Sequence, residues 1–131
     1  MAGFSEYGNY DAVGLAELIR NREVTAEEVL EAALIRMRAM QPELNAVVTE
    51  METEARQTLA EGLPEAPFAG VPFMVKDLNC LYAGVAMQNG SRFYADFVPD
   101  HDGEIVSRQK CAGLVTIAKT NTPEFGLCAT T

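Results

Sequence analysis

The stretch GVPFMVKDL, residues 70–78, contains a short apolar run, residues 73–78, that follows Gly70, Val71 and Pro72 and is interrupted near its end by Lys76 and Asp77. Its length is near that of a buried β-strand, and residues 114–118 form a second run of this kind. Between the two runs, Asp102 is placed to cap a helix that ends at Gly113. This order predicts a strand, a crossover helix and a parallel strand, joined with the usual right-handed connection.

Two strands do not form an independently stable sheet, so this unit requires further strands. We expect the sheet to continue in sequence beyond Thr131. The 131 residues are then predicted to be a fragment, the head of a longer polypeptide.

The residues before Pro67 favour helices. Asp11 is placed to cap a helix that runs through Arg20, and Thr25 with Glu28 forms a capping box that opens a second helix. Pro42 is predicted to end the second helix, and a third is predicted over residues 49–61. The second helix carries one apolar stripe, Val29, Leu30, Ala33, Leu34 and Met37.

Charge divides the chain near residue 67. Residues 1–66, the acidic N-terminal helical region, hold thirteen acidic and five basic residues, whereas residues 67–131, the α/β region, hold six and five. The net charge of -9 argues against a nucleic-acid partner. No apolar run reaches the roughly 18 residues that span a bilayer, and the first residues lack a signal-peptide pattern. We expect a cytoplasmic protein with no membrane partner.

The small number of cysteine and histidine residues limits the metal sites that the chain could form. The three cysteines, Cys80, Cys111 and Cys128, form neither a closed disulfide set nor a Cys-x-x-Cys pair, and we expect buried, reduced thiols. His101 is the only histidine, which excludes a multi-histidine metal site. No metal or organic cofactor is predicted. Asn89 and Gly90 are interpreted as a turn rather than a glycosylation site.

Lys76 is the most informative residue for chemistry. Alternation along the strand places it on the same face as Met74 and Leu78, where it would be partly desolvated. Burial lowers the pKa of a lysine and prepares it to accept a proton. The alternative from pattern alone is a lysine whose stem packs while its ammonium reaches water at the strand end.

Residues 70–77 resemble the G-V-P-x-x-[VL]-K-D strand of the amidase signature family. Further segments resemble that family in the same order: residues 42–47, His101 with Asp102, and residues 118–126, which read AKTNTPEFG. The resemblance extends from about Asp11 to Thr131. It departs at Ala118, where the family usually has glycine, and this small residue still permits close packing.

The resemblance implies a mixed sheet flanked by helices and hydrolysis of a small-molecule amide by a Ser–cisSer–Lys triad. Lys76 stands at the position of the family's base. Neither catalytic serine is present, because Ser91 resembles a structural turn serine and Ser107 lies within the crossover helix. The isolated chain is therefore expected to lack amidase activity.

The resemblance also implies roles for other positions. Leu127 and Cys128 resemble the segment that borders the acyl pocket, so they are candidate substrate-binding residues. Asp77 is expected to have a structural role, and Lys119 with Glu124 is interpreted as part of a turn capped by Thr122 rather than as a catalytic ion pair.

The residues that occupy these motifs resemble those of hydrolases of linear or cyclic amides more than those of the glutamine-dependent transfer RNA amidotransferases. Alternatives are an amidotransferase-subunit-like protein or a non-catalytic module that binds a partner through its acidic helices. The open edge of an incomplete sheet also favours self-association into a homo-oligomer.

Overall fold

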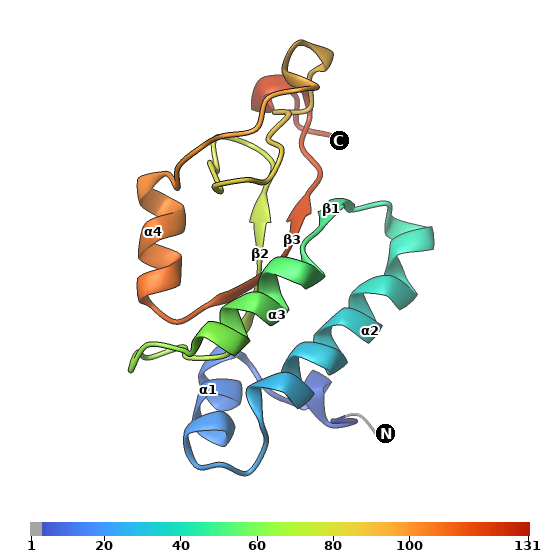
Figure 1. The fold of residues 1–131 in the computed structure, drawn as a ribbon. Coiled ribbons are helices and arrows are strands. Elements are labelled where there is room, and N and C mark those ends of the chain that lie inside the picture. Colours follow the sequence, from blue (N-terminus) through green and yellow to red (C-terminus); the bar gives the residue numbers. More distant parts are fainter. Residues whose placement is uncertain (1–3) are drawn as a thin grey trace.

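A computed structural model describes residues 4–131 as a mixed α/β fold with four α-helices and a three-stranded sheet (Figure 1). The helices are α1 (Ala12–Arg20), α2 (Ala26–Leu44), α3 (Glu52–Glu61) and α4 (Glu104–Cys111). The strands are β1 (Val47–Glu50), β2 (Pro72–Lys76) and β3 (Val115–Thr120). Three short 3-10 helices are η1 (Tyr7–Asn9), η2 (Arg92–Tyr94) and η3 (Glu124–Gly126).

The predicted strand–helix–strand unit is confirmed. Strands β2 and β3 are parallel neighbours, and the connection between them contains α4. The sheet order is β1-β3-β2, so β3 is central and β1 and β2 are its edges. Strand β1 pairs with β3 in the antiparallel direction, which makes the sheet mixed.

Strand β1 corrects the prediction that a helix begins at residue 49. The run Val47-Val48-Thr49 is β-branched and suits a strand, and its backbone pairs with residues 118–120 of β3. Helix α3 begins only after Met51, which is fully buried, and it ends at Gly62 in the left-handed region (φ 95). A pairing partner about 70 residues away therefore decided the local structure.

The N-terminal helices follow their predicted capping. The Asp11 carboxylate accepts the N–H of Gly14 at 2.8 Å, and Thr25 and Glu28 form the complete capping box. Pro42 does not end α2, which was the prediction. It lies in the last turn, where a proline removes one helical hydrogen bond near the end, and the helix stops at Asn45 in the left-handed conformation (φ 47).

The start of α4 also differs from the prediction. Its N-cap is Gly103, without a side-chain hydrogen bond, instead of Asp102. The Asp102 carboxylate accepts the N–H of Ala83 and pairs with Lys110 at 2.5 Å, so it fastens the preceding loop to the helix. Gly113 follows the helix with φ 86, as expected, and a Cβ there would lie 2.6 Å from the Ala69 Cα.

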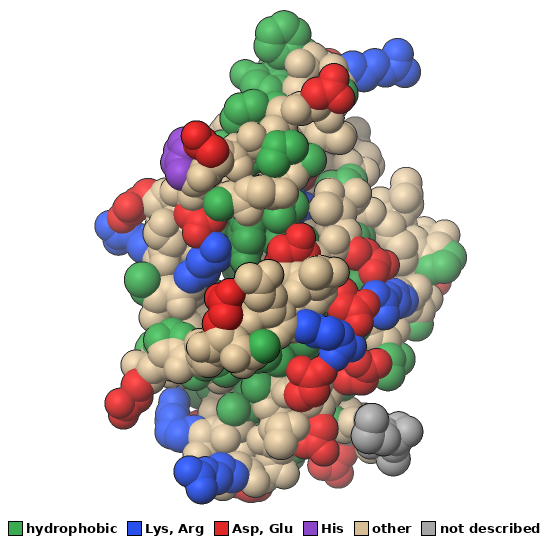
Figure 2. Space-filling model, viewed as in Figure 1, with side chains coloured by type: hydrophobic (Ala, Val, Ile, Leu, Met, Phe, Trp, Pro, Cys, Tyr) green, Lys and Arg blue, Asp and Glu red, His purple; other side chains and the backbone are tan. Residues whose placement is uncertain are grey.

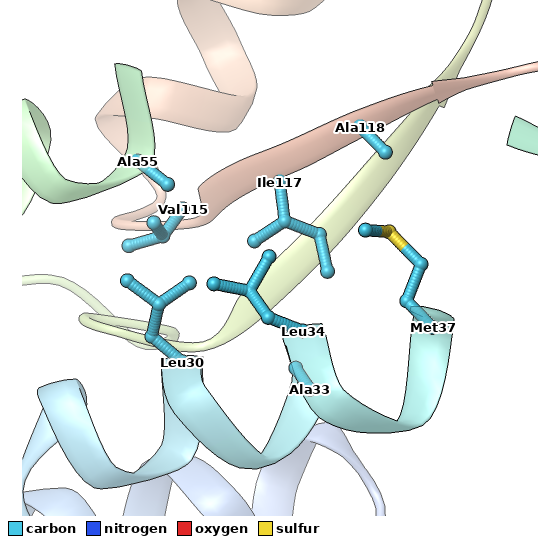
Figure 3. Packing of buried hydrophobic residues seen from close by; sticks show 8 residues of the cluster. All are labelled: Leu30, Ala33, Leu34, Met37, Ala55, Val115, Ile117 and Ala118. Carbon is cyan, nitrogen blue, oxygen red and sulfur yellow. The ribbon is translucent and has the colours of Figure 1, made fainter. Parts of the chain in front are cut away.

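The largest apolar core lies between α2, α3 and β3 (Figure 3). Helix α2 directs four of the five residues of its predicted stripe toward β3, and α3 adds Ala55. The fifth stripe residue, Val29, packs in a second cluster with α1 and Val71. The core residues are Leu30, Ala33, Leu34, Met37, Ala55, Val115, Ile117 and Ala118. Residues from both sides of position 67 thus share one core.

Acidic and basic side chains are interspersed over α2 and α3 on the face shown in Figure 2. Apolar side chains gather instead at the end formed by the 84–99 loop and the C-terminal segment, where Phe93, Phe97 and Leu127 are exposed. Among residues 4–131, no helix combines the length and apolar character that a membrane crossing demands.

Candidate active site

Lys76 is the last residue of β2 and pairs in register with Thr120, the last residue of β3. Both residues lie at the carboxyl ends of parallel strands, the edge at which open α/β sheets bind ligands. A hollow of about 310 Å³ adjoins this edge and is lined by Thr120, Asn121 and Thr131 with residues 44–46.

The side chain of Lys76 is exposed. It shares its sheet face with Met74, which is 37% exposed, whereas Val75 and Asp77 on the other face are buried. The predicted alternation holds, but the predicted partial desolvation of Lys76 does not, because nothing within residues 4–131 covers this side chain. The alternative, an ammonium that reaches water at the strand end, describes Lys76 in this chain.

The buried lysine of this region is Lys119 on β3, with 0% of its side chain exposed. Its ammonium donates to the carbonyl oxygens of Ala86 at 2.8 Å, Cys80 at 3.4 Å and Val85 at 3.5 Å. The carboxylate Oδ1 of Asp77 lies 3.8 Å away. The sequence carried a signal for this burial, since Lys119 follows the apolar run of β3 without a break, but it gave no partner.

The buried pair has shifted pKa values. Burial lowers the pKa of Lys119, and the nearby Asp77 carboxylate and Cys80 thiol oppose this change. Burial raises the pKa of Asp77, which the N–H of Gln88 and the ammonium of Lys119 counteract. The structural role expected for Asp77 has a physical form here: its carboxylate accepts the Gln88 N–H at 3.1 Å and neutralises a buried cation.

Residues 77–91, which we call the Lys119 loop, fold back against residues 121–126. Asn89 and Gly90 both have positive φ, so the predicted turn is confirmed. The Asn89 side chain accepts the Asn79 N–H, and its carbonyl accepts the Phe125 N–H. The loop and the C-terminal segment therefore form one layer at the carboxyl ends of β2 and β3.

Glu124 lies in the first turn of η3, as expected, and is not paired with Lys119. It accepts a hydrogen bond from the Ser91 hydroxyl at 2.7 Å, which fastens the Lys119 loop to η3. The N-cap of η3 is Pro123 and not the predicted Thr122. Thr122 is buried, and its hydroxyl donates to the Pro123 carbonyl.

Leu127 and Cys128, the candidate substrate-binding residues, are both exposed. They follow η3, in which a Cβ on Gly126 would lie 2.8 Å from the Leu78 side chain. Since Leu78 is two residues beyond Lys76, the structure brings the two predicted parts of the site to the same end of the sheet. Leu127 is 82% exposed, so no described residue covers it.

The serine and cysteine side chains are also candidate nucleophiles. Ser91 is buried and bonded to Glu124, and Ser107 lies within α4. The expectation of buried cysteines holds for Cys80 alone, because Cys111 ends α4 on its exposed side and Cys128 lies on the exposed C-terminal segment. Within residues 4–131, no three His, Cys, Asp or Glu side chains are grouped so as to hold a metal ion.

The fold and the site together define an α/β chain in which a lysine ends a parallel strand, beside the layer formed by the Lys119 loop and the C-terminal segment. The family model described as Amidase matches residues 28–131. The chain belongs to the amidase family, and the resemblance to the amidase signature enzymes is confirmed.

Curated relatives agree with this membership. The chain is 38% identical over 123 residues to 6-aminohexanoate-cyclic-dimer hydrolase of Paenarthrobacter ureafaciens, and the matched region covers 92% of this chain and 24% of that protein. It is 37% identical over 124 residues to a lipoamidase of Enterococcus faecalis, covering 93% and 17%. It is also 35% identical over 130 residues to one of the subunits of glutamyl-tRNA(Gln) amidotransferase in Lachnospira eligens, covering 94% and 27%. The chain therefore spans about a quarter or less of the length of these relatives.

The solved structures agree in fold. A structure of 6-aminohexanoate cyclic dimer hydrolase superposes with a TM-score of 0.87 at 38% identity, over 93% of this chain and 25% of that chain. A bacterial aryl acylamidase of the amidase signature family gives 0.81 at 26% identity, over 93% and 27%. The predicted fold class, the start of a mixed sheet flanked by helices, is confirmed.

Proposed function

We propose that this chain is the N-terminal part of an amidase and supplies the base, Lys76, of a Ser–cisSer–Lys triad. The observation that carries the proposal is the position of Lys76 at the carboxyl end of a parallel strand, within the segment that the family model matches. The relatives include amide hydrolases of several kinds, which supports hydrolysis of a carboxamide C–N bond as the activity of the whole protein.

The chemistry assigns one proton path. Neutral Lys76 accepts a proton from a bridging serine, which accepts one from the nucleophilic serine as its oxygen bonds to the substrate carbonyl carbon. The C–N bond then breaks, and the departing amine takes up the proton. Water attacks the resulting ester, releases the acid and regenerates the serine. Both serines belong to segments outside these 131 residues.

Lys76 is exposed in this chain, and the reaction favours a desolvated base. In the whole protein, segments outside these residues would cover Met74 and Lys76 and so exclude water from the base. Leu127 and Cys128 would border the acyl side of the same site, as proposed from the resemblance.

The isolated 131-residue chain is proposed to be inactive. Its buried Ser91 donates to Glu124, and its Ser107 lies in α4, so neither is a nucleophile for Lys76. Amide turnover by the purified chain that Lys76→Ala abolishes would contradict this part of the proposal.

A second candidate is an amidotransferase-like function, supported by 35% identity to part of the glutamyl-tRNA(Gln) amidotransferase of Lachnospira eligens. Substrates separate the two. A hydrolase acts on cyclic or linear amides without a partner, whereas an amidotransferase-like protein releases ammonia from glutamine and works with partner subunits. Within residues 4–131, β1 and β2 are the edge strands of the sheet, and such edges support self-association into a homo-oligomer.

The first experiment is the intact mass of the natural product that carries this sequence. A mass several times 14.2 kDa, the mass of these 131 residues, is expected. The longer protein is then assayed on 6-aminohexanoate cyclic dimer, a linear amide and glutamine. Lys76→Ala should reduce turnover by at least about 1,000-fold, and the matched variant Lys110→Ala should not. A natural product of 14.2 kDa would favour the non-catalytic binding module.

A further inference from the structure

A buried ion pair lies directly behind Lys76, and no catalytic step in the proposed reaction uses it. Lys119 is 0% exposed and Asp77 is 5% exposed, with 3.8 Å between the ammonium nitrogen and the nearer carboxylate oxygen. A buried pair of this kind is costly to desolvate, and apolar residues of similar volume often replace one at no loss of stability. Stability alone therefore does not account for the pair.

The backbone connects this pair to Lys76 on two sides. Asp77 follows Lys76 in the chain and donates its N–H to the Thr120 carbonyl at 2.9 Å. Thr120 is the register partner of Lys76, and Lys119 is the register partner of Val75. The ammonium and the carboxylate thus occupy the buried face of the two strand ends, and Lys76 projects from the opposite face.

Lys119 also holds the Lys119 loop. Its three ammonium hydrogens match three acceptors, the carbonyls of Cys80, Val85 and Ala86, which all belong to this loop. Asp77 closes the same loop through the N–H of Gln88. Without the ammonium, the three carbonyl oxygens would lose this donor, and the Asp77 carboxylate would lose its neighbouring cation.

Few other charges lie near the pair. The Cys80 thiol of the loop faces Lys119. Helix α4 contributes Lys110, which is paired with Asp102 and stacked on the Tyr82 ring at 4.0 Å. The N-terminus of α3 contributes apolar Met51, in the same cluster as Val75 and Cys80. The ion pairs found among residues 4–131 do not include Lys76, and the Asp77–Lys119 pair adjoins it in sequence and in strand register.

We propose that Lys119 is a positioning residue that acts on Lys76 through Asp77. Its ammonium anchors the Lys119 loop and neutralises the carboxylate that immediately follows the base. This inference rests on the proposed function of Lys76, and it adds a charge balance that the triad itself does not contain.

The test is the pH dependence of kcat/KM in the longest natural polypeptide that carries this chain. Lys119→Met leaves the Asp77 carboxylate unpaired, which favours the ammonium of Lys76. The acid limb of the kcat/KM profile should therefore move to higher pH by roughly 0.5–1 pH unit in this variant. Asp77→Asn still accepts the Gln88 N–H but leaves the Lys119 cation unpaired, so the limb should move to lower pH. The double variant should return the limb to its original position.

A control variant separates this effect from general destabilisation. Lys110→Met also removes a lysine from an Asp–Lys pair, but not behind Lys76, and it should leave the limb unmoved. The inference is overturned if both single variants leave the limb in place, if both move it in one direction, or if Lys110→Met moves it equally. Should Lys119→Met fail to fold, Asp77→Asn and the double variant still give the opposing shift and its cancellation.

A second readout is independent of activity. Amide hydrogen exchange in residues 80–91 should be about tenfold faster in Lys119→Met than in Arg108→Met, because the loop loses its central donor, whereas Arg108 pairs only with the exposed Glu104 of its own helix. Equal exchange in the two variants overturns the anchoring. If Lys76→Ala retains full activity, the proposed function fails, and the exchange result still decides whether Lys119 anchors the loop.

Discussion

At the scale of single residues, Gly90 fixes how the Lys119 loop meets the C-terminal segment. Its φ is +65, and a Cβ there would lie 2.5 Å from the Thr122 carbonyl oxygen. Gly90→Ala should lower the free energy of unfolding by about 2 kcal/mol or more, because conformational strain and a backbone clash add together. Urea denaturation measures the loss.

Gly84→Ala is the matched control for Gly90. Gly84 also has a positive φ, +76, but a Cβ there meets nothing within 4 Å. Its replacement should cost only the strain, about 1 kcal/mol. Equal losses for both variants would contradict the close approach of Gly90 to Thr122.

The three cysteines differ in reactivity because they differ in burial. Cys80 is buried, and burial raises the pKa of its thiol, whereas Cys111 and Cys128 are exposed. In the native chain, two thiols should react with a disulfide reagent, and the third should react only after denaturation. Cys128→Ala should reduce the fast count to one. A third fast thiol in the native protein would show that the Lys119 loop is open around Cys80.

At the scale of elements, α2, α3 and the end of β1 are joined by charged side chains. Arg56 on α3 contacts Glu27 and Glu31 of α2, and it also pairs with Glu52. Arg38 of α2 joins the same network through Glu52. Isolated surface pairs contribute little, but an arginine that contacts three carboxylates gains from the network geometry.

Arg56→Ala should therefore lower the free energy of unfolding by about 1 kcal/mol at low salt, and Gln57→Ala should lower it by less. The difference should shrink as salt is raised, because these charges are exposed. Hydrogen bonds from Arg38 and Arg56 hold the pKa of Glu52 below its ordinary value of 4.5. The contribution of the Glu52 ion pairs to the free energy of unfolding is thus present above pH 4.5 and is lost as the pH falls through the lowered pKa of Glu52. A difference that persists in high salt would rule out an electrostatic origin.

At the scale of the whole molecule, the main core joins the acidic helical region to the α/β region. Leu34 of α2 is 0% exposed and packs in one cluster with Val115 and Ile117 of β3. Leu34→Ala should cost roughly 3 kcal/mol, whereas Met40→Ala, at an exposed position of the same helix, should cost under about 0.5 kcal/mol. Circular dichroism and tyrosine fluorescence should report one coincident unfolding transition. Two separated transitions would mean that the regions on either side of residue 67 unfold independently.

Local signals in the sequence determined much of this fold. The Asp11 cap, the Thr25–Glu28 capping box and the Asn89–Gly90 turn all form as predicted, because each needs only residues a few positions apart. The apolar stripe of α2 follows from periodicity, and the β2–α4–β3 unit follows from two apolar runs and from Gly113, which ends the helix between them. The family resemblance was also readable, since residues 70–77 and 118–126 are contiguous motifs.

The tertiary structure decided the features that depend on distant partners. Residues 47–50 form a strand only because β3 offers an edge to pair with, and Asp102 leaves the helix cap because Ala83 and Lys110 are within reach. The pairing of Lys119 with Asp77 joins two strand ends 42 positions apart. No local pattern encodes such a pairing, because its energy arises from shared burial of opposite charges. The sequence thus predicted Lys76 as the base, which stays a prediction, and only the tertiary structure placed the Lys119–Asp77 pair on the opposite face of the same strand ends.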